Sequence, residues 1–206
     1  INHKHEIHLY NSIKDNILKI DRSKHDFVSC NWSPDGRFVV YNCSSNSRCS
    51  IIKVYDIKNK KIHNITKPIN KDYSPIFSSD GKYLAFISTR TFNPTYDNIQ
   101  FDLSFQKGER PYIITLSKDT QSPFIKSPDS EDENKDKKES KDNKDSKDSK
   151  DKIVKTKIDF NGIENRIMEI PIDENILSEH IGFSNDKLFY IVHETNIEFD
   201  ENSLGT

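Results

Sequence analysis

A repeat of 45 residues is the feature that most constrains the fold of this chain. The sequence WSPDGRFVVY at residues 32–41 returns as FSSDGKYLAF at residues 77–86. The same offset carries IHLY at residues 7–10 onto IKVY at residues 52–55. A shorter third copy, FSNDKLFY at residues 183–190, lacks the glycine. Because separate landmarks share one spacing, we infer that the chain repeats one supersecondary unit.

Each repeat unit is predicted to contain two β-hairpins. An Asp-Gly pair between apolar runs is a strong hairpin signal, because glycine accepts the positive φ that such turns require. The runs after these pairs, at residues 38–41 and 83–87, are almost continuously apolar, as expected of strands covered on both faces. Residues 51–55 and 61–65 predict a second hairpin with a polar turn. The chain shows no helical periodicity of useful length.

A four-stranded sheet that recurs about every 40–45 residues, with both faces buried, predicts an all-β fold, namely a β-propeller. The chain is long enough for about three blades, whereas closed propellers have about 4–8. We therefore expect an incomplete propeller. Trp32 and Phe77 occupy the same place in the repeat, and we expect both to be buried as packing aromatics between blades.

The chain is predicted to have three parts. Residues 1–125 hold the end of one blade and then two blades, the second of them at residues 72–125. Residues 126–152 form a Lys/Asp-rich insert with 9 basic and 10 acidic residues. We expect the insert to be disordered, because it has almost nothing to bury against the entropy of ordering. Residues 153–206 are predicted to begin a further, truncated blade.

The composition excludes several classes of function. A net charge of −2 gives no electrostatic footprint for nucleic acid or for a membrane surface. No apolar run approaches the roughly 20 residues of a membrane-spanning helix. The chain opens on a polar run with no signal-peptide pattern, and we interpret it as a fragment of a longer protein. We expect no cofactor, no nucleic-acid partner and no membrane association.

The cysteines, Cys30, Cys43 and Cys49, are too few and odd in number for a disulfide framework. One hypothesis is that Cys43 and Cys49 close a hairpin loop in an oxidising compartment. The interpretation that we favour is small buried thiols in a reducing cytoplasm.

Neither the histidines nor the serines predict a reactive site. His3, His5 and His8 could suggest a metal, but on a strand His8 points away from the other two, so we predict no metal site. Ser33 and Ser78 fall in predicted hairpin turns, where hydroxyls bond the backbone, and no Gly-x-Ser-x-Gly motif occurs. We therefore assign no catalytic residue.

The sequence after the second Asp-Gly motif is more particular than a generic blade. It contains, in order, STRTFNPTYD, FDLSF, RPYIITL and SPF, and after the insert IDFNGIENRI and EIPI. This order resembles the second, seven-bladed propeller of tricorn proteases and their bacterial homologues, over most of residues 25–125 and 153–175. The Asp-Gly motif alone is less specific, because TolB-type and prolyl-oligopeptidase-type propellers share it.

The resemblance implies a large cytoplasmic serine peptidase that trims oligopeptides, in which two propellers precede a PDZ-like module and a catalytic domain. This propeller would filter or guide peptides, or act as an assembly surface. Its implied partners are peptide substrates, the missing blades and catalytic domain of the same chain, and further copies of a homo-oligomeric parent. The family's catalytic residues lie outside the matched part. The alternatives are a stand-alone protein–protein interaction propeller and the propeller of a prolyl-oligopeptidase-like hydrolase.

Arg90 and Arg110 are the candidate peptide-channel contacts, since they flank strands in the specific segment together with Asp97 and Asp102. In one hypothesis the arginines line the channel and bind peptide carboxylates in bidentate pairs. In the other, which we favour, Arg90 or Arg110 pairs with Asp97 or Asp102 to fix a long loop.

Overall fold

The computed structural model describes residues 5–23, 27–46, 48–91, 95–96, 103–104, 108–124, 154–172, 177–184 and 187–192. Among these residues the structure consists of antiparallel sheets and one short 3-10 helix, η2 (Ile163–Arg166), without an α-helix. The predicted all-β fold is confirmed. The insert predicted at residues 126–152 lies outside the described residues. No helix in the described part of the chain is long and apolar enough to span a membrane.

The first complete sheet, which we call the first sheet, is the four-stranded unit predicted from two hairpins. It contains, in chain order, β3 (Phe27–Trp32), β4 (Phe38–Ser44), β5 (Ser50–Asp56) and β6 (Lys61–Asn64). Residues 38–43 of β4 are all buried. The apolar run at residues 38–41 therefore belongs to a strand with both faces covered, as expected.

The other complete sheet, the second sheet, takes its last strand from beyond the insert. It contains β7 (Asp72–Phe77), β8 (Tyr83–Ser88), β11 (Arg110–Thr115) and β12 (Ile167–Glu169) in that order. We predicted that this blade ends at residue 125 and that residues 153–206 begin the next one. That boundary is wrong, because β12 pairs with β11 through residues such as Met168, opposite Ile113.

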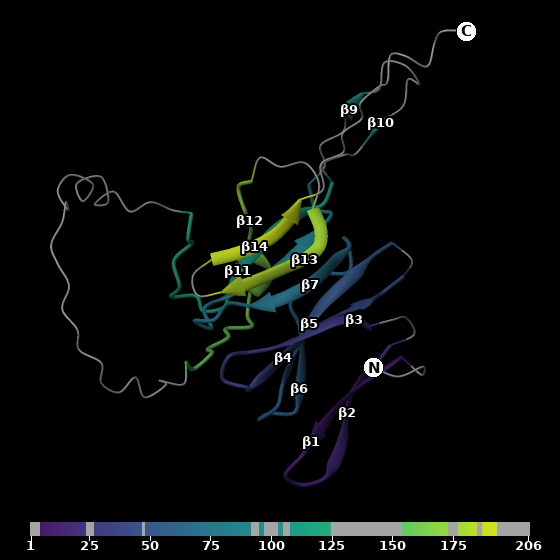
Figure 1. The fold of residues 1–206 in the computed structure, drawn as a ribbon, viewed down its shortest axis with the longest axis vertical. Coiled ribbons are helices and arrows are strands. Elements are labelled where there is room, and N and C mark those ends of the chain that lie inside the picture. Colours follow the sequence, from purple (N-terminus) through teal and green to yellow (C-terminus); the bar gives the residue numbers. More distant parts are fainter. Residues whose placement is uncertain are drawn as a thin grey trace, which may run out of the picture.

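Two hairpins accompany the complete sheets, and a smaller strand pair belongs to the connection that joins β8 to β11 along the chain. The hairpins are β1 (Glu6–Asn11) with β2 (Asn16–Arg22) and β13 (Leu177–Ser184) with β14 (Lys187–Val192), and the small pair is β9 (Thr95–Tyr96) with β10 (Leu103–Ser104). Figure 1 shows these units following one another, from β1–β2 to β13–β14. Strand β7 contacts both β3 and β13, so the first strands of successive units are neighbours, as they are around a propeller axis.

The 45-residue repeat is also a repeat of strand register. Trp32 lies opposite Val39, as Phe77 lies opposite Leu84. Tyr10 pairs with Ile17, as Tyr55 pairs with Ile62. In the third copy Phe183 pairs with Leu188 across a shorter turn, which agrees with the missing glycine.

Both Asp-Gly turns are held by the same hydrogen bonds. Ser33 Oγ donates to Asp35 Oδ1 at 2.7 Å and accepts from the Phe38 N–H at 2.8 Å. In the second turn Ser78 Oγ donates to Asp80 Oδ1 at 2.6 Å and accepts from the N–H five residues on at 2.9 Å. The prediction that these hydroxyls bond the backbone is confirmed.

Apolar side chains join neighbouring units in two clusters. The larger cluster lies between the two complete sheets and includes Phe38, Phe77 and Leu84. The smaller joins the β1–β2 hairpin to the first sheet and includes Ile20 and Tyr41. Each fully buried side chain of this size contributes about 1.5–3 kcal/mol, so stacking of the sheets is the main source of stability.

Trp32 departs from our prediction, since it is 51% exposed whereas Phe77 is 4% exposed. Trp32 lies opposite Val39, whose side chain faces the β1–β2 hairpin. That hairpin packs on β4 and β5 and leaves the end of β3 uncovered. Phe77 instead faces a complete four-stranded sheet.

Candidate functional site

The candidate arginines lie at one end of the second sheet, where the connection between β8 and β11 begins and ends. Arg110, the first residue of β11, is the register partner of Ser88, the last residue of β8. Arg90 follows two residues later. The antiparallel pairing therefore brings the two stems of the connection side by side.

Arg90 binds a fully buried carboxylate. Its Nη2 lies 2.7 Å from Asp72 Oδ2 and its Nε 3.3 Å from Asp72 Oδ1, a bidentate arrangement. Asp72 is 0% exposed and also accepts a 2.5 Å hydrogen bond from Ser88 Oγ. The guanidinium lies 5.5 Å and 5.9 Å from the ring centroids of Phe86 and Tyr112. The pair ties the stem after β8 to the start of β7.

Glu169 of β12 is the centre of a second polar cluster at this end. Its Oε2 accepts hydrogen bonds from Thr91 Oγ1 at 2.9 Å and Tyr112 OH at 3.2 Å. Arg110 Nε lies 3.8 Å from its Oε1, and Arg110 Nη1 donates to the Ile172 carbonyl at 3.0 Å. Burial, and less strongly the Glu169 charge, raises the pKa of Tyr112, so the phenol remains a proton donor to the carboxylate.

The structure thus brings Arg90 to Asp72 and Arg110 to Glu169. Neither carboxylate was predicted as the partner, and Asp97 and Asp102, which were, lie outside the described residues. The sequence did contain an indication of the role of Asp72. It lies 45 residues after Phe27, so the second repeat has a charged residue where the first has an apolar one. A charged residue in that register needs a partner if it is buried.

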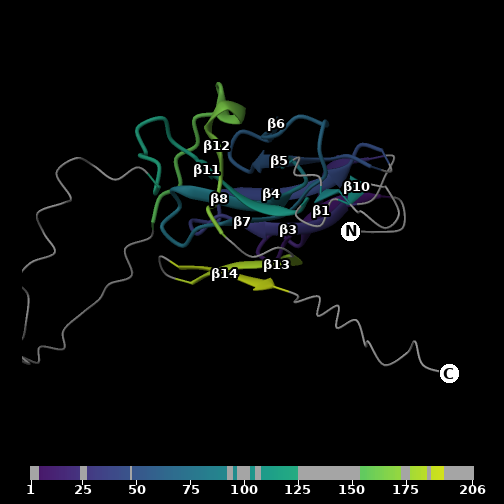
Figure 2. The same cartoon turned by 90° about the horizontal axis from the view of Figure 1, so that it is seen from above.

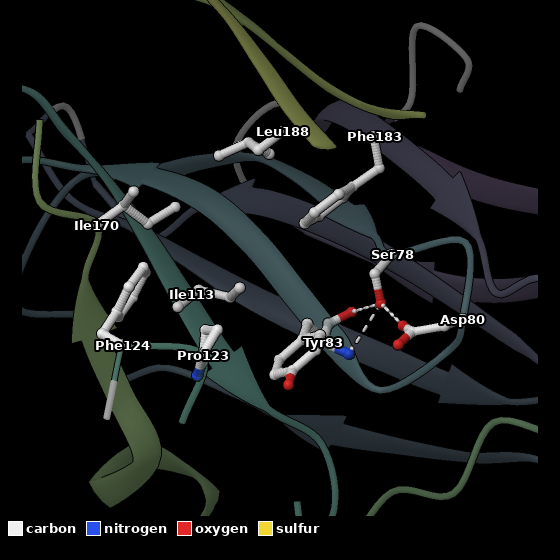
Figure 3. A pocket seen from close by; sticks show the side chains of 9 residues that line it. All are labelled: Ser78, Asp80, Tyr83, Ile113, Pro123, Phe124, Ile170, Phe183 and Leu188. Carbon is white, nitrogen blue, oxygen red and sulfur yellow. Dashed lines mark hydrogen bonds between the residues drawn. The ribbon is translucent and has the colours of Figure 1, made fainter. Parts of the chain in front are cut away.

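An apolar cavity of about 360 Å³ lies between the second sheet and the β13–β14 hairpin (Figure 3). It is lined by Ser78, Asp80, Tyr83, Ile113, Pro123, Phe124, Ile170, Phe183 and Leu188. The Ser78 hydroxyl forms the hydrogen bonds of the Asp-Gly turn, with Asp80 and the Tyr83 N–H, as Figure 3 shows. Burial alone would raise the pKa of Asp80, but hydrogen bonds from Ser78 and Lys82 outweigh it and lower the pKa. We interpret this cavity as part of the packing surface between successive units.

Comparison with known proteins decides the family. The family model of the tricorn protease second beta propeller domain matches residues 1–203. The chain belongs to the tricorn protease family. Its fold agrees with a crystal structure of the tricorn protease at a TM-score of 0.68 and 23% identity, over 89% of this chain and 17% of that one. The resemblance to the second propeller of tricorn proteases, stated from the sequence, is confirmed.

Curated tricorn relatives are similar over most of this chain. A Sulfurisphaera tokodaii protein, named as a tricorn-like protease C-terminal subunit, is 34% identical over 91% of the chain and 19% of its own length. A tricorn protease homolog of Saccharolobus solfataricus is 31% identical over 91% and 16%. Tricorn protease homolog 1 of Streptomyces coelicolor is 35% identical over 76% and 14%. The chain spans less than a fifth of the length of these relatives.

The cysteines and histidines of this tricorn propeller segment are only partly as predicted. All three cysteines are free thiols, but only Cys43 is buried, while Cys49 is partly exposed and Cys30 exposed. Strand β1 begins at Glu6, so His5 precedes it, and its φ is 55°. His8 Nε2 lies 3.3 Å from Glu6, and His3 lies outside the described residues. Within the described part of the chain no group of three or more His, Cys, Asp or Glu residues is placed to hold a metal.

Proposed function

We propose that this chain is a non-catalytic propeller part of a tricorn-like serine protease that degrades oligopeptides in the cytoplasm. Its role is to guide or gate peptides on their way to an active site elsewhere in the protein. Family membership supports this proposal, together with the names of relatives of whose length this chain covers less than a fifth. The partners are the remaining blades, the catalytic domain and further copies of the parent. The family match favours this function over a prolyl-oligopeptidase-type hydrolase.

The observation that carries the guiding role is the charged end of the second sheet. Glu169 is 42% exposed, and its orientation is fixed by Thr91, Tyr112 and Arg110. Arg90 is 23% exposed beside it, with its guanidinium fixed by Asp72. Fixed charges of both signs suit a surface that orients the two ends of a peptide, because charge-assisted hydrogen bonds are directional and strong.

The test uses the full-length protein and compares cleavage of a tripeptide substrate with cleavage of a longer peptide. We expect Glu169→Gln to lower kcat/KM for the longer peptide and to leave kcat/KM for the tripeptide unchanged. Only the longer peptide can contact the Glu169 surface and the active site at the same time. Glu109→Gln is the matched control, because Glu109 is 39% exposed at the same end and lies 3.8 Å from Lys71. An equal loss for both substrates would argue against guidance.

A separate measurement tests the non-catalytic assignment. The chain of residues 1–206 produced alone is expected to show no peptide hydrolysis, whereas the full-length protein hydrolyses short peptides at a rate abolished by serine-directed inhibitors. A stand-alone interaction propeller predicts no hydrolysis by the full-length protein either. Hydrolysis by the separate chain would overturn the proposal.

A further inference from the structure

Residues 154–166, which we call the strap, cross both complete sheets on the side of the Asp-Gly turns. The strap precedes β12 and ends in the 3-10 helix η2. In Figure 2 it is the green segment at the top of the view, above the sheets. Its sequence has no place in the 45-residue repeat, and the propeller fold alone does not require it.

The strap contacts the first sheet through its backbone and one aromatic ring. The Thr156 N–H donates to Asp35 Oδ2, in the first Asp-Gly turn, at 2.9 Å. The Phe160 ring stacks on the His63 imidazole with centroids 3.6 Å apart and planes at 7°. Phe38 meets the same ring edge-on at 6.3 Å. These contacts reach both hairpins of the first sheet.

The strap contacts the second sheet through hydrogen bonds along the chain that follows β11. The Asp159 N–H donates to the Leu116 carbonyl at 2.9 Å. The Asp159 carboxylate accepts from Ser117 Oγ and from the Lys118 N–H, both at 3.0 Å. Arg166 donates to the carbonyl oxygens of Leu116, at 3.1 Å, and Asp159.

The second Asp-Gly turn is shaped to receive the strap. Thr156 is 2% exposed, and a Cβ added at Gly81 would lie 2.7 Å from its Oγ1. Gly36 has almost the same φ, 66° against 65°, but a Cβ there would meet nothing within 4 Å. Gly36 needs to be glycine for its backbone alone, whereas Gly81 also leaves room for Thr156.

We infer that the surface formed by the two Asp-Gly turns, His63 and residues 116–118, which we call the strap surface, binds an extended polypeptide segment, and that the strap stays bound there when the chain is cut between residues 125 and 153. Apart from the Arg166–Asp159 hydrogen bond, which lies within the strap, these contacts join a residue before 125 to a residue after 153, so none of them requires the covalent connection. The strap surface favours a segment with a small β-branched residue against Gly81, followed by an acidic and an aromatic residue at 159 and 160. Two polypeptides can therefore assemble this part of the propeller.

The experiment cuts the full-length protein at an introduced recognition site for a sequence-specific protease, placed among residues 136–150. Hydrogen exchange of the strap amides, measured by mass spectrometry on peptides from residues 154–166, is compared before and after the cut. We expect the Thr156 and Asp159 amides to stay as protected as in the uncut protein, and both pieces to elute together in gel filtration. Exchange at unprotected rates after the cut, or separation of the pieces, would overturn the inference.

A matched pair of variants tests whether the strap surface itself holds the strap. In the cut protein, Gly81→Ala is expected to speed exchange of the strap amides by about tenfold, because its Cβ displaces Thr156. Gly36→Ala carries the same backbone strain without the steric contact, and the Asp159 amide, which binds Leu116 rather than this turn, should exchange as in the parent sequence. Equal effects of the two substitutions would show that the strap does not depend on this surface.

Discussion

Trp32 and Phe77 occupy equivalent register positions, opposite Val39 and Leu84, yet Trp32 is 51% exposed and Phe77 only 4%. Equivalent residues of a repeat need not be equally buried, because burial depends on the sheet that covers them. The β1–β2 hairpin covers less of the first sheet than the first sheet covers of the second.

Alanine at these two positions should therefore have different effects. Phe77→Ala is expected to lower the free energy of unfolding by about 3–5 kcal/mol, as for other large buried aromatics, and Trp32→Ala by much less. Chemical denaturation of the chain followed by circular dichroism measures both. Equal losses would mean that Trp32 is buried as completely as Phe77.

Arg90 is expected to matter more for stability than Arg37, although each pairs with a buried aspartate. Arg90→Ala leaves Asp72 buried without its cationic partner, which costs about 3–5 kcal/mol. Asp56, the partner of Arg37, also accepts hydrogen bonds from the backbone N–H and side-chain amide of Asn59.

Arg37→Ala is therefore the control for this prediction, with a loss nearer the 0–1 kcal/mol of an exposed pair, since Arg37 is 41% exposed. Denaturant midpoints of the two variants provide the measurement. A larger loss for Arg37→Ala would contradict the roles that we assign to these contacts.

Acid should unfold the chain through the carboxylates of the Asp-Gly turns. Burial opposes ionisation of Asp35 and Asp80, but hydrogen bonds from Ser33 and Ser78 and from nearby backbone N–H groups lower the pKa of both. A carboxyl with a pKa lowered in the folded state contributes stability above its ordinary pKa of 3.8. That contribution is lost as the pH falls through the lowered value.

The double variant Asp35→Asn and Asp80→Asn keeps an acceptor oxygen in each turn but cannot titrate. We expect the fall in unfolding free energy between about pH 5 and pH 2 to be shallower in this variant than in the parent sequence. Urea titrations at several pH values test this. Parallel curves for the two proteins would assign the acid sensitivity to other groups.

The sequence predicted the local elements of the fold and missed relationships that depend on distant partners. The Asp-Gly turns, the buried strands after them and the hairpin registers follow from residues near one another in the chain. Strand β12 was missed because only three of its residues pair, beyond an unrelated insert. The exposure of Trp32 depends on the neighbouring unit.

In the candidate site, too, the sequence predicted the local features and missed those that depend on distant partners. Arg90 and Arg110 were found from their flanking sequence, which is local. Their partners Asp72 and Glu169 lie on other strands, and Glu169 comes from beyond the insert. Only the strand pairing of the second sheet brings these residues together, so the sequence alone did not identify them.

Electron cryo-microscopy of the full-length protein tests the central claim that these sheets are neighbouring blades of one propeller. We expect the first and second sheets side by side, with β3 and β7 nearest a common axis and Trp32 covered by strands of a further blade. A map in which Trp32 and Phe77 occupy non-equivalent positions, or in which the two sheets belong to separate domains, would contradict it.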